Sequence, residues 1–167
     1  RVMVVELMGN KTGWLPLHAG IAGGADIILL PELPYDPKKV AAAVKRRAGS
    51  GKAFSIIAVA EGAMTMDEAK LKRKERLRQR TEQGFHTVSE QIAAYVESHT
   101  GCETRVVVPG HLQRGGAPSA YDRVLSTRFG AYAARLIQAK KFGVTVALKG
   151  NVVSENKLSD IAGKAKL

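Results

Sequence analysis

Short apolar runs alternate with longer amphipathic segments along the chain. The apolar runs have the length of strands, and their consecutive apolar positions are typical of strands that are covered on both faces. The spacing predicts strands at 3–7, 27–30, 54–60, 105–108 and 144–148. It predicts helices at 15–23, 36–48, 85–98 and 120–139, with a further basic helix near 70–80.

This alternation predicts an α/β fold, a Rossmann-like three-layer sandwich with a mainly parallel sheet and helices on both faces. Asp36 followed by Pro37 marks the start of the second helix, because Asp caps free N–H groups and Pro fits the first turn. The 167 residues suffice for one domain with a core, or for one domain and a fragment of another. Since Arg1 leads directly into an apolar strand with no initiator Met, we expect a fragment of a longer protein.

The net charge of +11 raises the possibility of a nucleic-acid partner. Between Lys70 and Arg80, seven cations stand against Glu75, with Leu71 and Leu77 as the apolar positions. No aromatic residue interleaves these cations as a base-stacking platform requires. The pattern therefore favours an exposed, solvated surface helix over a nucleic-acid site.

The single cysteine, Cys102, excludes an internal disulfide and fits a reducing cytoplasm. No apolar run reaches the length of a membrane helix, so we expect no membrane partner. His86 and His99 show no metal-ligand spacing with Cys102, and we expect no metal ligand in this chain.

Unusual residues follow three of the predicted strands. They are the turn at 6–10, Glu61 with Gly62, and the run Gly-His-Leu-Gln-Arg-Gly-Gly at 110–116. Because ligands of parallel sheets bind beyond the carboxyl ends of the strands, we expect Glu61, His111 and Arg114 to meet in one crevice. Arg105 and Arg114 have the forked donors that grip a phosphate, His111 adds a donor, and Glu61 accepts from hydroxyls. Together these residues describe a phosphorylated ligand with hydroxyl groups.

The same residues carry a resemblance to a known family. Met8-Gly9, the segment at 22–26, Pro31-Glu32, the run at 110–116 and the helix start at 121–128 resemble the phosphofructokinase family in the same order. The resemblance covers essentially the whole chain. It implies the phosphofructokinase fold and the sugar-phosphate-binding, C-terminal portion of a glycolytic 6-phosphofructokinase, which moves a phosphoryl group from ATP or pyrophosphate to the 1-hydroxyl of fructose 6-phosphate.

The resemblance also implies roles for individual residues. His111 and Arg114 would bind the sugar's phosphate within the subunit, and Arg105 and Arg1 would reach it from a neighbouring subunit. Met8 and Gly9 would contact the sugar, and Glu61 would accept from its hydroxyls. A homodimer or homotetramer is implied, because family members form active sites at a subunit interface.

Two departures from the family pattern bear on the chemistry. Asn10 stands where the family has an arginine that contributes to phosphoryl transfer. The family's "GGDGS" and "TIDND" segments, which carry the donor site, the Mg²⁺ ligands and the catalytic base, are missing from this sequence. We therefore expect no catalytic residue and no ATP, pyrophosphate or Mg²⁺ site in residues 1–167, and an isolated chain that is inactive. We expect the segment from about residue 115 to pack against an N-terminal domain.

Two other functions remain open at this point. One is a nucleic-acid-binding module that uses the basic helix, and the other is a non-catalytic domain that binds a sugar phosphate.

Overall fold

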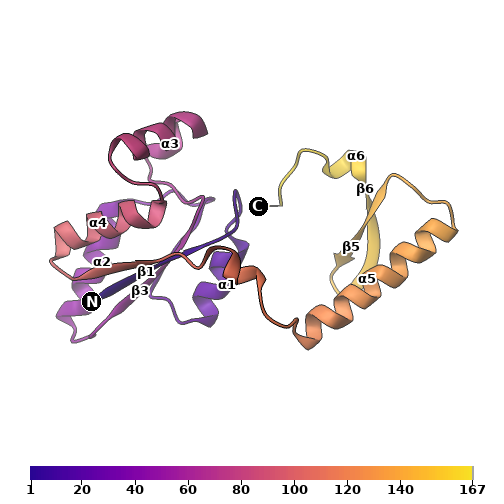
Figure 1. Ribbon diagram of the computed structural model, residues 1–167, viewed down its shortest axis with the longest axis horizontal. Helices are drawn as coiled ribbons and strands as arrows, with labels where there is room; N and C mark the ends of the chain where they lie inside the picture. Colours follow the sequence, from indigo (N-terminus) through magenta and orange to yellow (C-terminus); the bar gives the residue numbers. More distant parts are fainter. Residues whose placement is uncertain (167) are drawn as a thin grey trace. The chain divides into compact units, whose positions relative to one another are not determined.

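Four strands pair in parallel in the order β2-β3-β1-β4, and Figure 1 shows the two central strands, β1 and β3, side by side. The four strands are β1 (Val2–Leu7), β2 (Ile27–Leu29), β3 (Ser55–Ala60) and β4 (Thr104–Val107). In the register of the sheet Leu7 pairs with Ala60, and Val5 pairs with Val107. The carboxyl ends of β1, β3 and β4 therefore meet along one edge, as the sequence predicts.

Helices cover both faces of this sheet, which confirms the predicted three-layer α/β fold. On one face α2 (Pro37–Gly49) and α4 (Val88–Thr100) bury a core that includes Val44, Ile57 and Val96. On the other face α1 (Trp14–Ala22) lies against β2 and β3. A Cβ atom at Gly20 would lie 2.7 Å from the Ile28 Cδ1 atom, so glycine is what lets α1 approach the sheet.

A carboxylate in the middle of the sheet positions helix α4. Glu6 is only 8% exposed, and its Oε2 accepts hydrogen bonds from the backbone N–H (3.0 Å) and the hydroxyl (2.6 Å) of Ser89. Thr87 and Glu90 form a capping box around the same helix start. The buried charge of Glu6 is thus satisfied by the free donors and the positive end of a helix.

The structure, a computed structural model, describes residues 1–166, which divide into two compact units between Gln113 and Arg114. The sheet belongs to the first unit, Arg1–Gln113. Its remaining elements are the short helix η1 (Glu68–Lys70) and the basic helix α3 (Arg73–Glu82).

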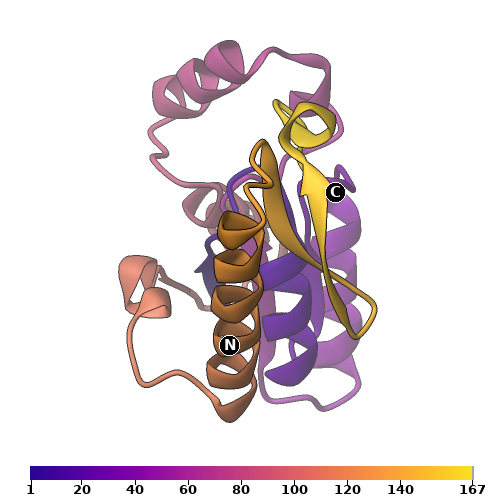
Figure 2. The same ribbon diagram turned by 90° about the vertical axis from the view of Figure 1, so that its right-hand side faces the viewer.

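The second unit holds a long helix and a small sheet of its own. Helix α5 (Ala120–Gln138) lies along a hairpin of β5 (Val144–Lys149) and β6 (Val152–Lys157), which α6 (Leu158–Ile161) follows (Figure 2). The strand predicted at 144–148 exists, but it does not belong to the parallel sheet. It pairs antiparallel with β6, a strand that the apolar pattern does not reveal because β6 ends in Ser154-Glu155-Asn156-Lys157.

Candidate functional site

A carboxylate from the neighbouring strand holds the turn that follows β1. Glu61 directly follows β3, and its Oε1 accepts hydrogen bonds from the backbone N–H groups of Gly9 (3.0 Å) and Asn10 (2.7 Å). The backbone N–H of Glu61 donates to the Leu7 carbonyl at 2.9 Å and so extends the pairing of β1 and β3 into the turn. Charge-assisted bonds of this kind make Glu61 a brace of the Met8-Gly9 turn. Its Oε2 accepts no hydrogen bond from residues 1–166, so this oxygen is the one that can meet a ligand.

Gly62 allows this brace to form. A Cβ atom at Gly62 would lie 2.0 Å from the carbonyl oxygen of Asn10, a distance that no side chain permits. Asn10 itself has a φ of 54°, in the left-handed region that asparagine tolerates better than most residues. The Glu61-Gly62 pair therefore fixes the backbone of the turn both by attraction and by close contact.

The loop after β4 meets the same turn from its other side. Its short helix η2 (Gly110–Arg114) carries Gln113, whose Oε1 accepts from the Met8 N–H (3.2 Å) and whose Nε2 donates to the Gly110 carbonyl (3.1 Å). His111 is exposed on this loop, at the same edge of the sheet as Glu61. Sequence reasoning gave Gln113 no role of its own, although it stands inside the run at 110–116 that was singled out.

Arg114 is the first residue of the second unit and is exposed. Its meeting with His111 and Glu61 in one crevice stays a prediction.

Arg1 and Arg105 lie near each other, but toward the amino ends of β1 and β4. Glu103 binds both guanidinium groups, with Oε1 2.6 Å from Arg105 Nη2 and Oε2 3.0 Å from Arg1 Nε. The hydrogen bond from Arg105, followed by the charge of Arg1, lowers the pKa of the Glu103 carboxyl, so it stays ionised. Arg105 therefore lies away from the carboxyl-end edge of its own chain that carries Glu61, and its contact with the phosphate of a neighbouring subunit stays a prediction.

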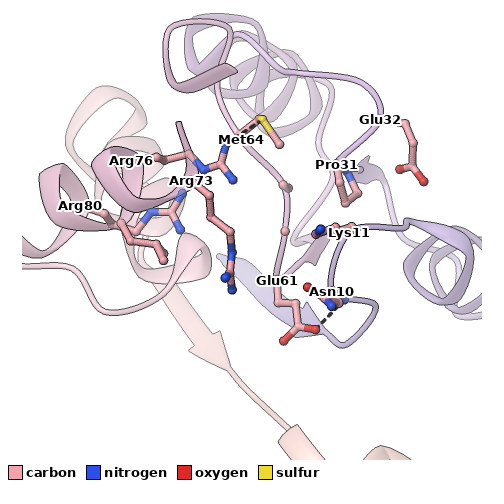
Figure 3. Close-up of a pocket in the computed structure, with 12 residues that line it drawn as sticks. Asn10, Lys11, Pro31, Glu32, Glu61, Met64, Arg73, Arg76 and Arg80 are labelled. Atoms are coloured by element: carbon pink, nitrogen blue, oxygen red, sulfur yellow. Dashed lines mark hydrogen bonds between the residues drawn. The ribbon is translucent and has the colours of Figure 1, made fainter. Parts of the chain in front are cut away.

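A pocket of about 830 Å³ opens at the carboxyl edge of the sheet, next to the braced turn. Its walls come from the loops after β1, β2 and β3 and from helix α3 (Figure 3). Asn10 and Lys11 lie on the wall formed by the turn, whereas Arg73 and Arg76 project from α3. A carboxylate of the wall, Glu32, turns its Oε1 to the Gly13 N–H at 2.8 Å.

The prediction that the basic helix is a solvated surface element is only partly confirmed. Most of α3 is exposed, but Arg80 is buried and its Nη2 lies 2.8 Å from Glu68 Oε1. The side chains of this pair are 5% and 10% exposed, and Arg80 Nε also donates to Gln91 at 3.2 Å. Sequence alone did not separate Arg80 from the other cations, because its carboxylate partner lies twelve positions away in another element.

The part of the chain that the structure describes contains no group of three or more His, Cys, Asp or Glu side chains placed to hold a metal ion. Among the same residues, no helix has both the length and the apolar character of a membrane span.

Comparison with known proteins identifies the family to which this chain is similar. The family model described as Phosphofructokinase matches residues 1–137. An "ATP-dependent 6-phosphofructokinase" of Spirochaeta thermophila is 48% identical over 99% of this chain and 45% of its own length. The "ATP-dependent 6-phosphofructokinase 3" of Bacteroides thetaiotaomicron is 44% identical over 100% of this chain and 45% of its own length. The chain thus spans about half the length of these curated relatives.

Solved structures of phosphofructokinases superpose on the fold of this chain. A phosphofructokinase from Saccharomyces cerevisiae superposes with a TM-score of 0.77 at 29% identity, over 96% of this chain and 20% of that one. A pyrophosphate-dependent phosphofructokinase from Nitrosospira multiformis superposes with a TM-score of 0.78 over 100% of this chain and 42% of that one, and at 23% identity it supports the fold alone. With the family model matched over most of the chain and the braced turn and glycine-rich loop in place, the chain belongs to the phosphofructokinase family.

Proposed function

We propose that this chain is the sugar-phosphate-binding portion of a glycolytic 6-phosphofructokinase, which transfers a phosphoryl group to the 1-hydroxyl of fructose 6-phosphate. The observation that carries the proposal is the convergence of Glu61 and Gln113 on the backbone of the Met8-Gly9 turn. These contacts bring the ends of β1, β3 and β4 into one surface that displays a carboxylate oxygen, an imidazole and open backbone. Such a surface suits a ligand with both hydroxyl groups and a phosphate.

Each residue has a distinct task in this proposal. His111 and Arg114 hold the 6-phosphate, since a neutral or cationic imidazole donates to phosphate oxygens and a guanidinium matches two of them at once. Met8 and Gly9 lie under the sugar, and the free Oε2 of Glu61 accepts from a hydroxyl group. Because Gln113 holds the His111 loop against the turn, it acts as a positioning residue.

Arg1 and Arg105 act from a second copy of the chain. Their position toward the amino ends of β1 and β4 keeps them out of their own chain's crevice, and their pairing with Glu103 holds the two guanidinium groups together on one exposed surface. A homodimer or homotetramer therefore completes the phosphate site.

The phosphoryl donor, the Mg²⁺ ligands and the catalytic base are supplied outside these 167 residues, as expected from the missing glycine-rich segments. The names of the curated relatives favour ATP over pyrophosphate as the donor. We place the enzyme in the cytoplasm, where glycolysis runs and where the free Cys102 stays reduced.

The nucleic-acid alternative finds less support. Three of the seven cations between Lys70 and Arg80 are neutralised by carboxylates within the first unit, and one of them, Arg80, is buried. A non-catalytic sugar-phosphate sensor uses the same site and differs only in the missing chemistry.

An isothermal calorimetric titration of the chain with fructose 6-phosphate tests the proposal. Removing a charged hydrogen-bonding partner costs about 1.5–3 kcal/mol, so Arg114→Ala is expected to weaken binding by roughly tenfold or more. Arg46→Ala, which removes an exposed arginine of α2, is the matched control and is expected to change nothing. Equal affinity of the Arg114→Ala variant and the parent chain refutes the proposed phosphate site.

Three further measurements separate the alternatives. Affinity for fructose 6-phosphate is expected to rise with chain concentration, because a second copy contributes Arg1 and Arg105. Formation of fructose 1,6-bisphosphate by the isolated chain in a coupled assay would contradict the assignment of the base and donor site to another part of the protein. Binding of DNA that weakens steeply with salt, without any binding of the sugar phosphate, would support the nucleic-acid module instead.

A further inference from the structure

The segment at 8–13, which follows β1, is held by side chains from the loops after the other three strands of its sheet. Its backbone N–H groups donate to Gln113, which comes after β4, to Glu61, which comes after β3, and to Glu32, which comes after β2. The two carboxylates approach from different loops (Figure 3). In the strand order β2-β3-β1-β4, Gln113 and Glu61 thus hold the near end of the segment, and Glu32 holds its far end at Gly13.

Glu32 has a single polar contact, and it is with this segment. Its Oε1 accepts from the Gly13 N–H at 2.8 Å, whereas its Oε2 is buried and accepts no hydrogen bond within residues 1–166. Burying a carboxylate oxygen without a donor costs free energy, so the position of this side chain calls for a reason. A Cβ atom at Gly13 would lie 2.7 Å from that same oxygen, so glycine is what lets the carboxylate lie against the segment.

Thr12 carries the restraint from Gly13 back to the turn. Its backbone N–H donates to the Gly9 carbonyl at 3.0 Å, and its hydroxyl donates to the same carbonyl at 3.2 Å. A Cβ atom at Gly9 would lie 2.4 Å from the Thr12 carbonyl oxygen, so the two residues are in close contact from both sides. Because Gly13 directly follows Thr12, a bond that fixes Gly13 also fixes Gly9.

The middle of the segment depends on such anchors. Asn10 and Lys11 are exposed, so packing against the core does not hold them. Asn10 also has a φ of 54°, and a backbone in this region persists where the surrounding structure holds it on both sides. Glu61 supplies the anchor before Lys11, and Glu32 supplies the anchor after it.

We propose that Glu32 is a positioning residue of the sugar site, which keeps the Met8-Gly9 turn in the conformation that lies under the sugar. This inference rests on the proposed function. Glu32 acts through the backbone, since its Oε1 fixes Gly13 and Thr12 passes the restraint to Gly9. Without Glu32 the turn is held from β3 and β4 alone, and the ligand has to order it on binding, which lowers the affinity.

Isothermal calorimetric titration with fructose 6-phosphate, in the parent, in Glu32→Ala and in Glu32→Gln, tests this role. Glu32→Ala removes a hydrogen bond to a charged acceptor, so it is expected to weaken binding by roughly fivefold or more. Glu32→Gln keeps an oxygen that accepts from the Gly13 N–H, so its affinity is expected to stay within about threefold of the parent. In Glu32→Ala, amide hydrogen exchange in residues 9–13 is expected to be faster than in the parent.

Asp36→Ala is the matched control. Asp36 lies in the same loop after β2 and also accepts from one backbone N–H, that of Lys38 at 2.9 Å, but it holds the start of α2 and not the segment at 8–13. Its removal costs helix stability and is expected to lower the midpoint of thermal unfolding. The affinity for fructose 6-phosphate is expected to stay within about twofold of the parent, because the turn keeps all its anchors.

A double-mutant cycle separates positioning from a general loss of stability. Glu32 and Gln113 hold the same segment, so the loss of affinity in the double variant Glu32→Ala with Gln113→Ala is expected to be smaller than the product of the two single losses. In the double variant Asp36→Ala with Gln113→Ala, the two effects are expected to multiply, since the two side chains hold different elements.

Each result has one meaning. The positioning role is refuted, while the proposed function stands, if Glu32→Ala binds the sugar phosphate as the parent does, or if Glu32→Gln loses as much affinity as Glu32→Ala. It is equally refuted if Asp36→Ala weakens binding as much as Glu32→Ala, or if the losses of Glu32→Ala and Gln113→Ala multiply. If the parent chain does not bind fructose 6-phosphate at any concentration, the proposed function fails, and this inference fails with it.

Discussion

The buried pair of Arg80 and Glu68 offers a sharp test of what holds the pocket wall in place. Replacing Arg80 with leucine leaves the Glu68 carboxylate 10% exposed, without its cation and with only the Thr65 N–H as a donor to its other oxygen. Breaking a buried pair from one side costs about 3–5 kcal/mol, because an unpaired charge stays buried. The lost hydrogen bond to Gln91 adds about 1 kcal/mol.

Helix α3 can avoid this penalty by detaching from the first unit. Arg80 is the one residue of α3 that is buried, so detachment exposes little apolar surface and returns Glu68 to water. We therefore expect Arg80→Leu to loosen α3 locally and to leave the sheet intact. A local loss of about 3 kcal/mol corresponds to amide hydrogen exchange that is roughly a hundredfold faster in residues 73–82.

Hydrogen exchange measured by mass spectrometry on peptides from α3 and from β1 checks this expectation. Arg78→Leu is the control, because the pair of Arg78 and Glu82 is 79% and 57% exposed and contributes at most about 1 kcal/mol. Combining Arg80→Leu with Glu68→Leu should restore much of the protection, since both charges are then gone. Unchanged exchange in α3, or equal loosening of α3 and β1, would refute the view that this pair is the anchor of the helix.

Three further predictions follow from single contacts. Gly62→Ala places a Cβ atom 2.0 Å from the Asn10 carbonyl oxygen, so it should displace the turn and abolish most binding of fructose 6-phosphate by calorimetry, while the far-ultraviolet circular dichroism stays that of the parent. Gln113→Ala removes the bond between the η2 loop and the turn after β1, so binding of fructose 6-phosphate should weaken by a few-fold, which corresponds to about 1 kcal/mol. Hydrogen bonds from Ser119 lower the pKa of Asp122 below its ordinary value of 3.8, so the capping box stabilises α5 above that pH and the stabilisation is lost as the pH falls through the lowered pKa. A carboxyl titration by nuclear magnetic resonance should show the Asp122 pKa returning toward 3.8 in Ser119→Ala, and an unaltered titration would contradict the capping role.

The elements of the first unit were predictable because local signals and tertiary packing agree there. Asp36 accepts from the Lys38 N–H, and Pro37 opens α2, as the residue types indicate. Three of the four strands that pair in parallel are apolar on most consecutive positions, whereas β4 has only Val106 and Val107 as an apolar signal. The hairpin of the second unit was not predictable in the same way, because β6 is too polar for its pattern to stand out from a loop.

For the candidate site, the sequence predicted which residues lie together but not what each of their atoms contacts. Glu61, His111 and the Met8-Gly9 turn were identifiable, since each follows a strand and parallel strands bring their carboxyl ends to one edge. Whether a carboxylate oxygen faces the ligand or the backbone depends on atoms that come from another strand. Glu61 proved to brace the turn with one oxygen, and only the other is left for a ligand.

The sequence by itself determined the α/β class and the parallel sheet with helices on both faces, because these follow from the periodicity of apolar residues. It also determined the edge of the sheet at which the candidate binding residues lie, because these residues directly follow the strands. Only the tertiary structure decided how the charges are distributed. It buried Arg80 against Glu68, gathered Arg1 and Arg105 at Glu103, and left Arg73 without a partner at the wall of a pocket. The physical reason is that a charge acquires its role from the partner it meets in space, and those partners come from elements that the linear pattern does not bring together.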